Sequence, residues 1–147
     1  MGVWLSQCVA TDYILKEQGI RLMNNFLRIV VALPAIGFLV IGLRWAIDPS
    51  TAASDLGMTL LSGLGRSSQI ADVGALFLSM GSMILIALIT GQRSWFYAPA
   101  LMLLFVAVLR MLAWIVHDAA LALDMVIVEI IVASVLLLAS ARLSRES

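Results

Sequence analysis

Four long apolar runs, separated by shorter polar segments, dominate the sequence. They cover about residues 26–47, 70–90, 95–116 and 120–141. Each run is close to the length of about 20 residues that a helix needs to cross the hydrocarbon layer of a bilayer. The runs are too long for strands and do not alternate, and backbone groups in lipid must be satisfied within their own segment. The pattern therefore predicts an all-α integral membrane protein with four transmembrane helices.

Two of the three connections are short. The second and third runs are joined by residues 91–94, and the third and fourth by residues 117–119. Short links between helices force the helices to be antiparallel neighbours. We therefore expect a four-helix bundle with up-down topology.

The first connection is longer and mixes polar and apolar residues. Asp48 followed by Pro49 is typical of a helix start, since Asp caps and Pro suits the first turn. We expect a short interfacial helix over about 50–62, ended by Gly63 or Gly65, on the outer side of the membrane.

The pattern predicts a single transmembrane domain over residues 26–142. Residues 1–25 would be a cytoplasmic N-terminal extension, and residues 143–147 a cytoplasmic tail. Met23 stands just before the first apolar run and resembles a natural start. This gives the hypothesis that residues 1–22 are a mis-assigned upstream extension, which N-terminal sequencing of the native protein beginning at Met1 or Gly2 would reject.

Composition supports the membrane assignment and narrows the chemistry. Of the 147 residues, 63% are hydrophobic and 12% charged, against about 25% charged in soluble domains. Nine Lys and Arg balance nine Asp and Glu, so no basic surplus favours nucleic acid. Cys8 is the only cysteine, which excludes an internal disulfide and a thiolate metal site. We expect no cofactor and no metal.

Lysine and arginine positions predict the orientation. Cytoplasmic loops carry an excess of these residues, and six lie on one side of the predicted bundle against two, Arg44 and Arg66, on the other. The six are Lys16, Arg21, Arg28, Arg93, Arg142 and Arg145. Both termini would then be cytoplasmic, in a membrane of the bacterial inner-membrane type. Aromatic residues near the run ends are expected as interfacial anchors: Trp45, Trp95, Tyr97 and Trp114.

The second run contains a stripe of small residues. Its members follow helical spacing and have Gly74 and Gly81 beside them: Ala71, Ala75, Ser79 and Ser82. Small residues let helices approach closely in lipid. We expect tight packing inside the bundle, with a homodimer through this face as the alternative.

Charged residues inside the third and fourth runs are the main candidates for function. Arg110 lies in the third run, and Asp124 and Glu129 lie in the fourth. An ionised group at mid-helix costs roughly 2.5–3.5 kcal/mol on insertion scales, so such groups normally face the interior and pair. Counting from the turn places Arg110 and Asp124 at nearly equal depth, with Glu129 deeper but within reach.

Two interpretations of this cluster stay open. In the first, a buried Arg–carboxylate pair fixes the register of the two helices. In the second, a polar pocket or ligand-binding core occupies the outer half of the bundle, with Asp124 close by, lined by Asp72, Arg110, Trp114, His117 and Glu129. A metal site built on His117, the only histidine, is not expected, and no catalytic motif assigns catalytic residues.

The spacing of these residues resembles a known family. The chain resembles the DoxX-like superfamily of four-helix membrane proteins, and is most similar to the uncharacterised domain-of-unknown-function 4345 family. The resemblance covers about residues 26–142. It is carried by Asp48-Pro49, Asp72 with Gly74 and Gly81, Arg110, and Glu129. It implies a four-helix bundle with an Arg–Glu polar core and no assigned activity; some relatives are accessory subunits of oxidoreductase complexes or chaperones for membrane partners.

Three functions are compatible with the sequence. We favour a non-catalytic accessory subunit that binds a membrane-protein partner or lipid. The first alternative is an enzyme or binding pocket for a small lipophilic molecule with a polar head, which Arg110 would hold. The second is a small proton-coupled transporter with Glu129 as the carrier, against which stands the absence of an inverted repeat.

Overall fold

Helices account for all the regular structure in the part of the chain that the structure describes. The computed structural model describes the backbone of residues 2–143 and the side chains of residues 18, 19 and 22–143. Its elements are α1 (Gly2–Ile47), α2 (Pro49–Asp55), α3 (Gly63–Ser68), a π-helical turn η1 (Gln69–Val73), α4 (Gly74–Thr90), α5 (Ser94–His117) and α6 (Leu123–Arg142).

Four stretches are long and apolar enough to cross a membrane, judged by length and composition. They are Leu22–Ile47, Gly63–Thr90, Ser94–His117 and Leu123–Arg142. The predictions of an all-α chain and of a membrane protein are confirmed at this level.

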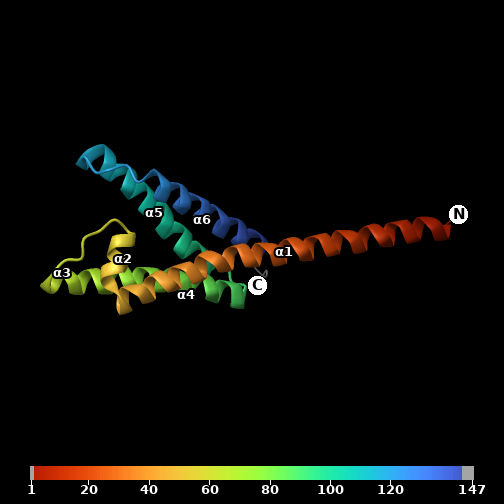
Figure 1. The fold of residues 1–147 in the computed structure, drawn as a ribbon. Helices are drawn as coiled ribbons and strands as arrows, with labels where there is room; N and C mark the ends of the chain where they lie inside the picture. Colours follow the sequence, from red (N-terminus) through yellow and green to blue (C-terminus); the bar gives the residue numbers. More distant parts are fainter. Residues whose placement is uncertain (1, 144–147) are drawn as a thin grey trace.

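The long helices form two pairs. α1 packs most extensively against α4, and α5 against α6, whereas contacts between the two pairs are fewer. Figure 1 shows that the pairs lie together near the turn between α4 and α5 and diverge toward their other ends. We call these the Arg93 end and the His117 end. The N-terminal part of α1 extends well beyond the other helices (Figure 1).

The main core lies toward the Arg93 end and draws on all four long helices. Its buried residues are Val31 and Ala35 of α1, Met80, Ile84 and Ala87 of α4, Phe96, Ala100 and Leu103 of α5, and Ala133, Leu136 and Ala139 of α6. A hydrogen bond also links the α4–α5 turn to α6 here, because Arg93 Nε donates to the carbonyl oxygen of Ser140 at 3.1 Å.

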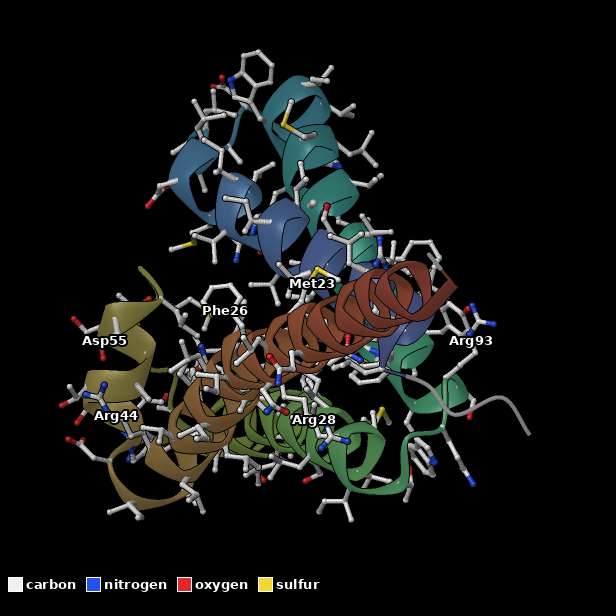
Figure 2. The ribbon with its side chains drawn as sticks, turned by 90° about the vertical axis from the view of Figure 1, so that its right-hand side faces the viewer. Met23, Phe26, Arg28, Arg44, Asp55 and Arg93 are labelled. Atoms are coloured by element: carbon white, nitrogen blue, oxygen red, sulfur yellow. The ribbon has the colours of Figure 1, made fainter. Side chains whose placement is uncertain are left out.

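A second, smaller core lies at the His117 end, without any residue of α5 or α6. It consists of Trp45 from α1 with Ala52 and Ala53 from α2, and apolar residues of η1 pack against it. The α5–α6 hairpin therefore leaves the main core and continues with only its own two helices in contact. Figure 2, viewed from the side at which α1 begins, also shows this hairpin standing apart from α1, α2 and α4.

Three glycines hold α1 and α4 close together. A Cβ at Gly42 would lie 2.9 Å from the backbone nitrogen of Leu78, and one at Gly81 would lie 2.7 Å from the carbonyl oxygen of Ala35. A Cβ at Gly74 would meet the Cβ of Trp45 at 3.3 Å. Close backbone approach through small residues is a main source of helix association in lipid, so this crossing depends on the absence of side chains.

The stripe of small residues expected to pack inside the bundle lies on the exposed face of η1 and α4, not on the face that meets α1. Ala71, Ala75, Ser79 and Ser82 are all exposed, while the neighbouring Gly74 and Gly81 are buried. The expectation that the four-residue stripe packs inside the bundle is wrong within this chain. The π-helical turn η1 and the glycine contacts set which face of this helix meets α1.

The start of α2 agrees with the sequence, and its end does not. Asp48 Oδ1 accepts from the backbone N–H of Thr51 at 3.3 Å, and Pro49 occupies the first turn. The helix ends at Asp55 rather than near residue 62, because Ala53 O accepts from the backbone N–H groups of both Leu56 and Met58 in a tight turn. Arg44 and Asp55 pair at 2.6 Å across the α1–α2 corner (Figure 2).

Gly63 begins a helix instead of ending one. It has a φ of +56°, which suits a chain reversal before α3. Gln69 then fixes the loop, since its Oε1 accepts from Leu61 N at 2.8 Å and its Nε2 donates to Thr59 O at 3.1 Å. As a result, the second apolar helix begins several residues before the expected position 70.

The other boundaries differ in smaller ways. α1 is continuous through residue 26, where the first helix was expected to begin. α5 agrees with the expected 95–116 to within a residue, and α6 begins at Leu123 rather than 120. Trp45 is fully buried, so its expected role as an interfacial anchor is wrong: α2 folds back and covers it.

Candidate functional site

Arg110 and Glu129 form an ion pair between α5 and α6. Arg110 Nε donates to Glu129 Oε1 at 2.8 Å. The Glu129 side chain is 11% exposed and that of Arg110 35% exposed. The pair lies on the His117 side of the hairpin residues that belong to the main core. Ala107 and Val126 are buried three residues before Arg110 and Glu129 respectively.

The length of the α5–α6 connection decides which carboxylate meets Arg110. The connection runs over residues 118–122, longer than the three residues expected, and Asp118 turns the chain with a φ of +53°. Arg110 stands seven residues before the end of α5, and Glu129 six residues after the start of α6. At about 1.5 Å per residue both are about 10 Å from their helix ends. Glu129, not Asp124, is therefore level with Arg110.

Both members of the pair keep unused hydrogen-bonding groups. Glu129 Oε2 is buried and has no hydrogen-bond partner. Among the described residues, the two terminal nitrogens of Arg110 have none either, because its single bond is made by Nε. The contact is thus single rather than the two-point contact that Arg and carboxylate often form.

The other candidates lie apart from this pair. Asp72, Trp114, His117 and Asp124 are all exposed, and within the described chain neither aspartate forms an ion pair with Arg110. Asp72 is in η1, on the α1–α4 side of the molecule. Trp114 and His117 follow Arg110 at helical spacing on one face of α5. The structure therefore brings together Arg110 and Glu129, with Trp114 and His117 farther along α5 toward the His117 end. It does not bring three carboxylates together.

Two features of the structure were not singled out from the sequence. Gly42 was overlooked because one glycine in an apolar run gives no indication of its partner. The other feature is the buried Trp45 Nε1, which has no hydrogen-bond partner. The sequence indicated only that a second helix follows Trp45 directly, not that this helix buries it.

The surroundings of the pair are apolar and uncovered. Exposed large apolar side chains of the hairpin include Val108, Leu109, Leu112, Ile115, Val116, Leu123, Ile127, Val128, Ile130 and Ile131. Apolar exposure is ordinary in lipid, because lipid tails are as apolar as leucine. A partly exposed Arg110 side chain among these apolar residues is unusual, because charged groups inside a membrane normally face the protein interior and pair there.

Comparison with known proteins adds no relative. No protein-family model, no curated protein and no solved structure matches the chain. The resemblance to the DoxX-like superfamily therefore stays a prediction.

Proposed function

We propose that this protein is a non-catalytic accessory subunit of a membrane, and that it binds a membrane component through the His117 half of the α5–α6 hairpin. The observation that carries the proposal is the uncovered Arg110. Its side chain is 35% exposed and keeps unused donors, in a part of the hairpin that contributes no residue to either core. A charge at this depth favours an interior partner, and among the described residues Arg110 pairs with Glu129 alone.

The Arg110–Glu129 pair has a structural part in this proposal. It links α5 to α6 beyond the main core and fixes one register of the hairpin. The α1–α4 pair, with its glycine contacts and the α2 corner, serves as the rigid base from which the hairpin projects.

The proposed arrangement in the membrane is an up-down bundle of the bacterial inner-membrane type. By their places in the helices, Arg28, Arg93 and Arg142 belong to the Arg93 end, whereas Arg44, near the end of α1, belongs to the other end. By the preference of Lys and Arg for the cytoplasm, the Arg93 end and both termini are cytoplasmic. The His117 end and α2, as an interfacial helix, then face outward.

Native mass spectrometry of the full chain, released gently from its own membrane, tests the proposal. We expect a reproducible additional mass, either a second protein chain or a lipophilic molecule. Loss of that mass in the variant Arg110→Met/Glu129→Met, with its retention in Arg28→Met, would assign it to the hairpin. A wild-type protein that is always a bare monomer would contradict the proposal.

A further inference from the structure

The terminal nitrogens of Arg110 define the chemistry that the hairpin can recognise. A guanidinium has five N–H donors and no acceptor. Nε uses one of them on Glu129 Oε1, which leaves four donors without a hydrogen bond among the described residues. Glu129 Oε2 offers no acceptor to an incoming molecule, because it is buried. Since Oε1 is already bonded to Arg110 and Oε2 is buried, the unbonded groups that the pair offers are the Arg110 donors, and a molecule that binds them has to bring an acceptor oxygen.

The charge of the pair selects a neutral acceptor. Glu129 already neutralises Arg110 at 2.8 Å. A second anion on the same guanidinium would lie close to the Glu129 carboxylate, where low dielectric makes like-charge repulsion strong. A carbonyl oxygen accepts the same hydrogen bonds without adding a charge. From this juxtaposition of a neutralised, donor-only guanidinium and apolar helix faces, we infer that the hairpin binds a neutral carbonyl-bearing lipophilic molecule.

The depth of Arg110 favours a small lipophile over a partner helix. Arg110 lies about 10 Å along α5 from His117. A transmembrane helix has its backbone carbonyls already bonded, and a carboxylate side chain at that level costs roughly 2.5–3.5 kcal/mol to insert. A ketone or ester on an apolar chain enters the layer at far lower cost and gains a charge-assisted hydrogen bond there.

The face of α5 between Arg110 and the His117 end gives such a molecule a route from the membrane–water boundary. Trp114 and His117 follow Arg110 on one helical face, and both are exposed. Trp114 is 45% exposed and, one helical turn from Arg110, offers a flat apolar surface on the same face of α5. An occupant lying along this face would cover Trp114 and bring its carbonyl to Arg110.

This inference rests on the proposed function, since it names the membrane component. Its test uses the full chain in nanodiscs made of ether-linked phosphatidylcholine, which contains no carbonyl. Three probes of equal chain length are added: a long-chain methyl ketone, the matching fatty acid and the matching alkane. Native mass spectrometry counts bound molecules, and the fluorescence change absent from a Trp114→Phe variant reports contact at Trp114.

We expect saturable binding of one ketone to the wild type and to Arg28→Met. Binding to Arg110→Met/Glu129→Met should be at least about ten-fold weaker, because a hydrogen bond to a charged group is lost. Arg110→Lys keeps the charge opposite Glu129 but reduces the spare N–H donors from four to two and removes the planar guanidinium, so it should also bind more weakly. Should the double variant fail to fold, Arg110→Lys alone decides the question.

Three results would overturn the inference: equal binding of the alkane, tighter binding of the fatty acid, or unchanged ketone binding in the variants.

Nanodiscs of ester-linked phosphatidylcholine separate two sources of the carbonyl. Competition by these lipids would identify a lipid ester as the occupant, and unchanged ketone binding would identify a free lipophile. If the native extract carries a second protein chain and no ketone binds, the inference fails while the proposed function stands.

Discussion

The two helix pairs are held together by different physics. α4 contains no charged residue, and it meets α1 where Gly42, Gly74 and Gly81 leave no room for a side chain. Beyond the main core, α5 and α6 meet through the Arg110–Glu129 ion pair, with only Ala107 and Val126 buried beside it.

The difference shows how each pair would fail. Glycine contacts depend on shape, so they tolerate no added methyl group, but they do not depend on any partner residue being ionised. An ion pair inside an apolar layer depends on both members, because loss of one leaves the other without a counter-charge. The α1–α4 pair is therefore sensitive to added volume, and the α5–α6 hairpin to lost charge.

Removing one member of the ion pair should have the largest effect. Arg110→Met leaves the buried Glu129 carboxylate unpaired, and we expect a loss of about 3 kcal/mol in the free energy of unfolding, at the lower end for broken buried pairs because Arg110 is partly exposed. A denaturant titration in micelles, followed by far-UV circular dichroism, measures it.

The double variant Arg110→Met/Glu129→Met sharpens the same comparison. Replacing both charges by apolar side chains of similar size is often neutral or stabilising. We expect its free energy of unfolding to lie within about 1 kcal/mol of that of the wild type. A double variant as unstable as Arg110→Met would show that packing volume, rather than charge pairing, holds the hairpin.

Adding one methyl group to the α1–α4 crossing should have the next largest effect. In Gly81→Ala the new Cβ would lie 2.7 Å from the carbonyl oxygen of Ala35 and 3.0 Å from the backbone nitrogen of Leu39. Backbone atoms cannot yield as a flexible side chain can, so we expect a loss of about 2 kcal/mol, typical of overpacking. The same titration measures it.

Gly37→Ala is the matched control on α1. A Cβ there would meet nothing within 4 Å, and alanine is a better helix former than glycine by about 0.8–1.0 kcal/mol. This variant should be as stable as the wild type or more stable. Equal losses in Gly37→Ala and Gly81→Ala would contradict the idea that the crossing depends on close approach.

The sequence predicted the helices better than their contacts. Apolar run length identified four membrane-spanning candidates, because lipid leaves a long apolar segment few alternatives to a helix. It did not reveal the divergence of the two pairs, since apolar faces look the same whether lipid or protein covers them. Nor could small-residue spacing tell the exposed stripe of Ala75 and Ser79 from the buried Gly74 and Gly81.

The candidate site was predictable in part for a similar reason. Arg110 stood out because a charge in an apolar run is costly, and a carboxylate partner on the next helix followed from the short connection. The choice between Asp124 and Glu129 depended on where α6 begins. The connection 118–122 shifted that start, and nothing in its composition fixes its length.

The smallest expected effect concerns α2, which covers Trp45 on the α1–α4 side and has no counterpart on the hairpin. Hydrogen bonds from Thr51 and then Ser50 lower the pKa of Asp48 from 3.8 to about 2. A depressed carboxyl pKa means that ionised Asp48 favours the folded α2 fully above pH 3.8, and that this contribution is lost as the pH falls through about 2.

Hydrogen exchange over residues 49–56, compared between the wild type and Asp48→Asn at each pH, measures this contribution. Asn keeps a capping oxygen but has no carboxyl to titrate. We expect the protection of α2 in the wild type to fall between pH 3.8 and about 2 relative to that of Asp48→Asn, while the hairpin peptides change equally in both proteins. A parallel pH response of the two proteins in α2 would mean that packing on Trp45, rather than the Asp48 cap, holds this helix.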